Sequence, residues 1–397
     1  MALDSTPRAN RLHLGIFGKV NTGKSTFLNT MTDQKAAIVS NIAGTTTDPI
    51  YKAMELAGIG PVVWIDTAGT KDETTLSAER QKKTLEAAKK TDLAFVLFEE
   101  ADITEGLAWI EYFRKKKTPV LPIINQHTEN EARAKTLQRT LAEKIKEPIL
   151  VLDVANPAIR HLIRKKILER MPESFEAAGI LDRYVTPGDV LMFVMPQDIQ
   201  APKGRLILPQ VQSLRNALDL TCSVLCCTTD QFNRSLAALK EAPALIVCDS
   251  QVIQYVAENC PEESRLTTFS ILFSAYKGDL AVFRDGIETL ERLPKNSRIL
   301  IAEACTHAPM HEDIGRVKIP RLLKKKISPD LVIDFTTGVD FPADLASYDL
   351  IIHCGACMFN RKYVLSRIAE AQAAGTAITN YGMVLAYLTG SLAAVNM

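Results

Sequence analysis

The sequence lacks an excess of charge of either sign. Its 397 residues include 47 lysines and arginines against 46 aspartates and glutamates, which leaves a formal net charge of +1. We therefore expect no electric field that would draw the whole protein onto nucleic acid or anionic lipid. The chain has two tryptophans in all, which gives little support to a surface of aromatic side chains that stack on RNA bases.

Long apolar runs are missing as well. The N-terminal stretch MALDSTPRANRLHLG has no apolar core of the kind that a secretory signal needs, and no run of about 18 uninterrupted apolar residues occurs. We therefore expect a cytoplasmic protein that does not contact a membrane. Thiols are normally reduced in that compartment, so the eight cysteines are expected to be buried, metal-binding or catalytic rather than paired in disulfides.

The first motif with recognisable chemistry follows the apolar run at residues 12–17. GKVNTGKST, residues 18–26, fits the phosphate-binding pattern G-x-x-x-x-G-K-S and leads into the start of a helix. Two glycines allow a tight turn whose N–H groups point at phosphate oxygens, while Lys24 would bridge the outer phosphates and Ser25 would ligate magnesium. The predicted nucleotide-binding residues are Gly18, Asn21, Thr22, Gly23, Lys24, Ser25, Thr26 and, further along the chain, Asn125.

Two later stretches have the character of nucleotide switches. NIAGTTTDP, residues 41–49, offers threonines in a loop, and VVWIDTAGT, residues 62–70, is an apolar strand that ends in Asp66. Asp66 would hold magnesium through water, and Gly69 would offer its N–H to the γ-phosphate. The predicted catalytic residues are Lys24, Asp66 and Gly69.

This ordered set of motifs resembles the translation-factor-like small GTPases, most closely the branch of the tRNA-modifying enzyme TrmE and the ribosome-assembly GTPase Era. The resemblance implies that Thr45 or Thr46 is a magnesium ligand and that Asn21 holds a potassium ion. Thr70 stands where other GTPases carry a water-orienting glutamine. The resemblance therefore implies slow, potassium-dependent hydrolysis of GTP.

One motif departs from that branch. Where the family has Asn-Lys-x-Asp, this chain reads Asn125-Gln126-His127-Thr128. The aspartate selects guanine by accepting hydrogen bonds from two N–H groups of the base, which Thr128 cannot do. Either Glu129 supplies the missing carboxylate, or guanine is bound weakly, or the choice of base is relaxed. The preference for GTP over ATP stays open.

The rest of the chain predicts further α/β structure. Leu137, Leu141 and Ile145 have the spacing of a helix packed on the core, in a helix-rich stretch that closes the first domain. Beyond residue 189, short apolar runs such as VLMFVMP, SVLCCTT and LTTFSILFS alternate with helical patterns, which predicts parallel sheets. The cysteines of the middle region, Cys222, Cys226, Cys227 and Cys248, are expected to be buried apolar residues.

Two stretches gather cysteine and histidine differently. A predicted strand at residues 298–302 is followed by Cys305 and His307, and a second one at residues 349–352 is followed by His353, Cys354 and Cys357. In open α/β sheets, ligands bind outside the carboxyl ends of the strands. If these strands are parallel neighbours, all five side chains reach one edge of a sheet. An amphipathic helix is expected to begin near Phe359.

Spacing alone does not choose the chemistry of this site. Zinc would accept any four of the five side chains, and a [4Fe-4S] cluster would accept three cysteines with a labile or histidine ligand. A redox Cys-x-x-Cys would need neither Cys305 nor the histidines. Reduced, buried thiols also remain possible.

The order of motifs along the whole chain is similar to one family, the [FeFe]-hydrogenase maturation GTPases known as HydF. The resemblance rests on the GTPase motifs, on Cys-x-His followed by His-Cys-x-x-Cys, and on APKGRLILPQ, EDIGRVKIPR and TNYG. It implies a GTPase domain at residues 1–172, a middle dimerisation domain at 184–265 and a cluster-binding domain at 266–397. It also implies a homodimeric scaffold that receives a diiron precursor, built with the radical-SAM maturases HydE and HydG, and delivers it to apo-[FeFe]-hydrogenase.

The resemblance assigns a role to each residue of the cysteine stretches. Cys305, Cys354 and Cys357 become the thiolates of a [4Fe-4S] cluster whose fourth iron position is open or weakly held. His307 and His353 are candidates for that position or for support around it. The alternative interpretation is a TrmE- or Era-like GTPase that acts on RNA and carries a structural zinc module.

Overall fold

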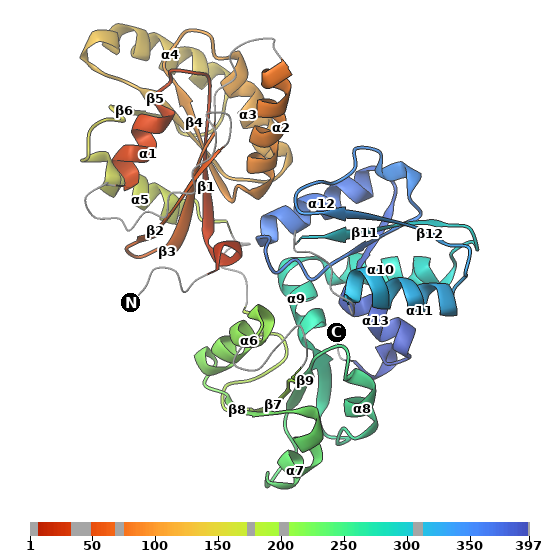
Figure 1. Cartoon of the computed structure of the whole chain (residues 1–397). Helices are drawn as coiled ribbons and strands as arrows, with labels where there is room; N and C mark the ends of the chain where they lie inside the picture. Colours follow the sequence, from red (N-terminus) through yellow and green to blue (C-terminus); the bar gives the residue numbers. More distant parts are fainter. Residues whose placement is uncertain are drawn as a thin grey trace. The chain divides into compact units, whose positions relative to one another are not determined.

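The computed structural model describes residues 7–32, 49–67, 75–172, 179–197, 206–304 and 313–395, without the side chains of 75–78 and 394. The chain divides into two compact units, residues 1–177 and 178–397 (Figure 1). The first unit holds the predicted phosphate-binding loop, and the second holds the described residues of the cysteine stretches.

The first unit is built on a six-stranded sheet in the order β2-β3-β1-β4-β5-β6, in which β2 alone runs antiparallel to its neighbour. Its strands are β1 (Leu12–Phe17), β2 (Ile50–Leu56), β3 (Gly60–Asp66), β4 (Leu93–Phe98), β5 (Val120–Asn125) and β6 (Leu150–Leu152). Its α-helices are α1 (Lys24–Thr32), α2 (Thr75–Lys90), α3 (Thr104–Lys115), α4 (Glu131–Lys144) and α5 (Ile159–Glu169).

Helices cover both faces of this sheet. One core packs α1 and α5 against alternate residues of β1 and β4, and the other packs α2, α3 and α4 against the remaining residues (Figure 1). Every residue of β1 and β4 is buried, as expected for parallel strands covered on two sides. In α4, Leu137 and Leu141 are buried on the core face and Ile145 is buried directly after the helix, as the sequence predicts.

The second unit contains two four-stranded sheets in which every pairing is parallel, in the orders β10-β9-β7-β8 and β12-β11-β13-β14. The strands are β7 (Val190–Val194), β8 (Ser223–Cys227), β9 (Leu245–Cys248), β10 (Arg265–Thr268), β11 (Arg298–Glu303), β12 (Val332–Thr337), β13 (Leu350–His353) and β14 (Ala377–Asn380). The α-helices are α6 (Leu208–Asp219), α7 (Phe232–Ala237), α8 (Ile253–Glu258), α9 (Phe269–Lys277), α10 (Leu280–Glu291), α11 (Ile319–Lys326), α12 (Arg361–Ala373) and α13 (Tyr381–Thr389).

Several short helical turns connect these elements. Within the described residues, 3-10 helices lie at η2 (Arg8–Asn10), η3 (Thr128–Asn130), η4 (Thr229–Gln231), η6 (Leu345–Ser347) and η7 (Leu392–Ala394), and a π-helical turn, η5 (Ile314–Lys318), precedes α11. The predicted fold class, α/β with largely parallel sheets, is confirmed.

Helix α9 connects the packing of the two sheets in the second unit. Phe269, Leu272 and Phe273 pack in the core beneath β7 and β9, whereas Ile271 belongs to the core that includes β11 and β13. The Thr268 hydroxyl caps the helix by accepting a hydrogen bond from Ile271 N at 3.2 Å. The run LTTFSILFS is therefore strand in its first residues and helix afterwards.

The prediction for the middle cysteines is wrong in one place. Cys222 and Cys248 are buried, and Cys227 packs partly buried against a core. Cys226, however, is exposed on β8, an edge strand of its sheet. Alternation along an edge strand sends every second residue to solvent, so an apolar run there does not guarantee burial.

None of the helices in the described part of the chain is long and apolar enough to cross a membrane.

Candidate functional site

The phosphate-binding loop between β1 and α1 has the backbone that its glycines predict. Gly18, Asn21 and Gly23 have φ angles of 131°, 66° and 89°. A Cβ atom on Gly18 would lie 2.4 Å from the carbonyl oxygen of Leu97, so no side chain fits there. The left-handed turns bring successive N–H groups into one concave face ahead of the helix N-terminus, which is a site for phosphate.

Lys24 lies folded against this loop. It is 7% exposed, and its Nζ donates to the carbonyl oxygens of Gly18 at 2.7 Å and Lys19 at 2.6 Å. Burial lowers the pKa of Lys24, while the charge of Asp66 opposes that shift. The Thr22 hydroxyl donates to Lys19 O at 2.9 Å and closes the turn.

Ser25 and Asp66 form the pair expected of a magnesium site. The Ser25 hydroxyl donates to Asp66 Oδ2 at 2.7 Å, and Asp66 Oδ1 is buried without a hydrogen-bond partner among the described residues. Burial raises the pKa of Asp66, and the Ser25 hydrogen bond and Lys24 oppose the rise. An orphaned carboxylate oxygen beside a hydroxyl fits Mg²⁺, which takes oxygen ligands. Thr26, the next residue of α1, is exposed.

Asn125, at the end of β5, joins three segments of the nucleotide site. Its Nδ2 donates to Glu99 Oε2 at 2.9 Å, and its Oδ1 accepts from Val154 N at 3.3 Å. The same amide lies 2.8 Å from the position of a Cβ on Gly23, so it packs directly on the phosphate-binding loop. His127 Nε2 lies 3.3 Å from Glu99 Oε1. Sequence reasoning missed Glu99, although it follows an apolar strand at the edge where ligands gather.

The residues that replace the usual guanine-binding aspartate lie on an exposed turn. Thr128 and Glu129 are exposed in η3, whereas Asn130 is buried and donates from Nδ2 to Asn125 O at 3.0 Å. No described contact brings Glu129 towards Asn125.

Six residues of interest lie outside the described residues, and their roles stay predictions: Thr45, Thr46, Gly69, Thr70, Cys305 and His307.

The cysteine stretches follow two neighbouring strands. β11 and β13 are adjacent and parallel, with Ala302 opposite His353, as the sequence predicts. Cys354 N donates to Ala302 O at 2.9 Å, which continues the ladder one step past β13. Cys354 and Cys357 therefore follow the carboxyl end of β13, six and three residues before Asn360, the N-cap residue of α12 (Arg361–Ala373).

The sulfur of Cys354 lies where two backbone N–H groups would stabilise a thiolate. Its Sγ accepts hydrogen bonds from Ala304 N at 3.0 Å and Ala356 N at 3.4 Å. Burial raises the pKa of the Cys354 thiol to about 11, and these two N–H groups act in the opposite direction. Ala356 adopts a left-handed conformation in the turn, with a φ of 51°. Sulfur donors held at one turn fit a zinc ion or an iron-sulfur cluster.

His353 is enclosed rather than open to a metal. It is 1% exposed, with Nδ1 2.8 Å from Cys354 O and Nε2 3.1 Å from Nη1 of Arg367. Because arginine can only donate, Nε2 accepts and Nδ1–H donates to Cys354 O. Burial, and then the charge of Arg367, lower the pKa of His353 to about 3. A neutral ring with both nitrogens engaged favours support of the turn over direct ligation.

Sequence reasoning also missed Lys277, the last residue of α9. Its Nζ donates to the carbonyl oxygens of Ala356, Cys357 and Phe359. Nearly 80 residues separate it from the turn, and an isolated lysine at a helix end gives no signal of such a contact. Among the described residues, which exclude Cys305, no three His, Cys, Asp or Glu side chains form a metal-binding group.

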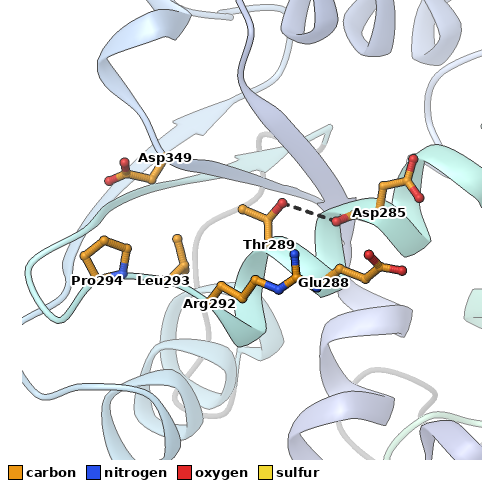
Figure 2. A pocket seen from close by; sticks show the side chains of 7 residues that line it. All are labelled: Asp285, Glu288, Thr289, Arg292, Leu293, Pro294 and Asp349. Carbon is orange, nitrogen blue, oxygen red and sulfur yellow. Dashed lines mark hydrogen bonds between the residues drawn. The ribbon is translucent and has the colours of Figure 1, made fainter.

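A pocket of about 320 Å³ lies at the amino ends of β11 and β13, the end of the sheet opposite the cysteine turn (Figure 2). Asp349, just before β13, and residues of α10 and its following loop line this pocket, and Asp349 Oδ2 accepts from the N–H of Arg298 at 2.7 Å. The lining residues are Asp285, Glu288, Thr289, Arg292, Leu293, Pro294 and Asp349. Since β11 and β13 begin there, the pocket is separate from the cysteine turn, which follows the other end of β13.

Curated relatives resemble the first part of the chain. The tRNA modification GTPase MnmE of Treponema denticola is 32% identical over 155 residues, which are 37% of this chain and 33% of that protein. GTPase Der of Wolinella succinogenes is 26% identical over 201 residues, 45% of this chain and 42% of that protein. The chain thus spans less than half the length of these relatives.

Solved structures add little to this. A variant of Era from Aquifex aeolicus bound to GDP and AlF4⁻ is 15% identical and covers 54% of this chain and 92% of its own, with a TM-score of 0.33. A similarity at this score carries no argument about function.

Family models match three consecutive parts of the chain. The 50S ribosome-binding GTPase model matches residues 13–126. The hydrogen maturase F dimerization domain matches residues 180–278, and the hydrogen maturase F tetramerization domain matches residues 281–395. Because both models specific to hydrogen maturase F follow a GTPase domain in one polypeptide, the chain belongs to the hydrogen maturase F family.

Proposed function

We propose that this chain is a GTP-hydrolysing scaffold for maturation of [FeFe]-hydrogenase. It binds a [4Fe-4S] cluster through Cys305, Cys354 and Cys357, receives a diiron precursor and transfers it to apo-hydrogenase. The observation that carries the proposal is the Cys354 thiol, which accepts two backbone N–H groups beside the end of β11. Cys305 follows the end of β11 by two residues in the sequence, and its role as the third thiolate stays a prediction.

In the nucleotide site, the chain's own residues bind and orient the triphosphate. The N–H groups of the loop and the Lys24 ammonium neutralise phosphate charge, which is the main catalytic contribution in phosphoryl transfer. Ser25 and Asp66 would hold Mg²⁺, Thr45 or Thr46 would complete its ligands, and Gly69 would bind the γ-phosphate. Mg²⁺ supplies charge neutralisation between the outer phosphates when bound.

In the cysteine site, an incomplete set of protein ligands suits a carrier. Cys305, Cys354 and Cys357 would hold the cluster through three thiolates, and with no fourth cysteine the cluster would supply an iron open to exchangeable ligands. His353 fixes the carbonyl of Cys354 through its Nδ1–H, and His307 stays a candidate for the open position.

Metal analysis tests the cluster. After anaerobic purification and reconstitution with iron and sulfide, we expect stoichiometric iron, acid-labile sulfide and a paramagnetic resonance signal on reduction. Cys354→Ser should lose most of the iron, whereas Cys226→Ser, which changes an exposed thiol on β8, should keep it. Stoichiometric zinc without iron, or unchanged iron in Cys354→Ser, would overturn the scaffold and favour the alternative, a TrmE- or Era-like GTPase that acts on RNA and has a zinc module.

Turnover in different salts tests the GTPase assignment. We expect slow hydrolysis that is faster in K⁺ than in Na⁺, because Asn21, exposed in the loop with a φ of 66°, would hold a potassium ion beside the phosphates. Asn21→Ala should remove the difference between the two salts while nucleotide binding persists. Faster hydrolysis of ATP than of GTP would contradict the guanine preference, which the exposed Thr128 leaves open.

The remaining elements of the proposal concern organisation. The names of the two matching domain models support self-association, and we propose a homodimer built by the middle domain. The division into residues 1–172, 184–265 and 266–397 stays a prediction, as do cytoplasmic location, the radical-SAM partners HydE and HydG, and the lack of nucleic-acid and membrane partners. Copurification of the tagged chain with apo-hydrogenase, lost in Cys354→Ser, would support the delivery step, and copurification with RNA alone would contradict it.

A further inference from the structure

A buried lysine at the end of α9 forms hydrogen bonds with the turn that carries Cys354 and Cys357. Lys277 is 2% exposed, and its Nζ donates to Ala356 O at 3.1 Å, Cys357 O at 3.2 Å and Phe359 O at 2.9 Å. A lysine ammonium has three N–H donors. All three are therefore used on one short turn, which fixes the direction of its carbonyl groups.

A second cation, which belongs to the segment after the turn, donates hydrogen bonds back to α9. Nη1 of Arg361, in the first turn of α12, donates to the carbonyl oxygens of Tyr276 and Ala275 at the end of α9. Carbonyl groups at a helix C-terminus lack partners within the helix and attract cations. The end of α9 and the segment from Ala356 to Arg361 are thus linked by two cations rather than by apolar packing alone.

Among the described residues, Lys277 forms no ion pair with a carboxylate. Its hydrogen bonds there go to carbonyl groups, and its Nζ lies over the ring of Phe273, 5.7 Å from the centroid. A buried cation is costly unless an anion lies close by. The Nζ atom lies 3.2 Å from the carbonyl oxygen of Cys357, one of the predicted thiolate ligands. Burial lowers the pKa of Lys277 to about 8, and the charges of Cys357 and Cys354, when these thiols are ionised, oppose that shift. The lysine is thus suited to a site that becomes anionic when it is loaded.

We propose that Lys277 is a positioning residue of the cluster site, which holds the Cys354–Cys357 turn and places a positive charge beside the anionic cluster. The inference rests on the proposed function. One-electron reduction adds a negative charge to the cluster, so a nearby fixed cation stabilises the reduced state and raises the reduction potential. Lys277 ends α9 and lies within residues 180–278, which match the dimerization domain, whereas the three predicted cluster cysteines lie within residues 281–395, which match the tetramerization domain. A residue of the first region would therefore raise the reduction potential of a cluster held by the second.

The test uses four variants of the full chain, each purified anaerobically and reconstituted with iron and sulfide. Lys277→Met removes donors and charge, Lys277→Gln keeps a donor without charge, and Lys277→Arg keeps both. Lys324→Met, on the exposed face of α11, is the matched loss of one positive charge. Iron content, the midpoint potential in a dithionite titration and amide hydrogen exchange of the metal-free turn are measured for each.

We expect Lys277→Met and Lys277→Gln to make the midpoint potential of the cluster more negative. The expected shift corresponds to about a tenfold decrease in the ratio of reduced to oxidised cluster at a given potential, which is 59 mV for one electron. Faster exchange at residues 354–360 should appear in Lys277→Met and be partly restored in Lys277→Arg. Potentials and exchange equal to those of Lys324→Met would overturn the inference. Should Lys277→Met fail to fold, the Gln variant decides by the same two measurements. If the parent chain binds no iron, the proposed function itself fails.

Discussion

Glu99 orients Asn125, at the part of the nucleotide site where the base is expected to bind. It accepts a hydrogen bond from the Asn125 amide and lies beside His127, and Asn125 in turn packs against Gly23 of the phosphate-binding loop. A single carboxylate therefore orients the amide that links β5 to the loop. The arrangement differs from the family's pattern, in which the aspartate of Asn-Lys-x-Asp would contact the base directly; Thr128 stands at that place in this chain.

Glu99→Ala should weaken GTP binding without disturbing the fold. The amide of Asn125 would lose a partly buried, charge-assisted hydrogen bond, worth about 1.5 kcal/mol, which corresponds to roughly a tenfold loss of affinity. Titration with a fluorescent GTP analogue measures this.

Glu129→Ala is the informative comparison for Glu99→Ala. Its side chain is exposed in η3, so the same titration should give an affinity equal to that of the parent chain. If Glu129→Ala binds GTP much more weakly while Glu99→Ala does not, Glu129 moves in to read the base and the role assigned to Glu99 is wrong.

At the scale of elements, buried parallel strands were the most predictable features. The runs at residues 12–17 and 62–66 are mainly apolar because both faces of these strands are covered. The glycine after the first run and the carboxylate that ends the second mark the end of the sheet where ligands bind. The adjacency of β11 and β13 followed from the same rule. These predictions hold because they depend on local pattern and on one general property of parallel sheets.

What failed depended on contacts between distant segments. The run LTTFSILFS changes from strand to helix because Thr268 caps α9, and apolar content alone does not distinguish the two. The partners of His353 and of the Cys354 turn, Arg367 and Lys277, are supplied by tertiary packing from α12 and α9. A single sequence gives no signal for such pairs, so the place of Cys354 after β13, beside β11, was predictable and the residues that support its turn were not.

At the scale of the whole molecule, the two sites lie in separate compact units, residues 1–177 and 178–397. Lys24, Ser25 and Asp66 belong to the first unit, and Cys354 and Cys357 belong to the second. Each unit has cores of its own, so loss of chemistry in one does not require loss of structure in the other.

Lys24→Ala should therefore abolish GTP hydrolysis and leave the absorbance of the cluster unchanged. The substitution removes the ammonium that would contact the outer phosphates, a contact made within the first unit alone. Phosphate release and the visible spectrum of the same reconstituted sample measure the two outcomes. Both tryptophans, Trp64 and Trp109, lie in the first unit, so intrinsic fluorescence checks in that sample that the altered unit is still folded. Loss of hydrolysis and cluster together, with native fluorescence, would show that the units are coupled and that the proposed separation of the two sites is wrong.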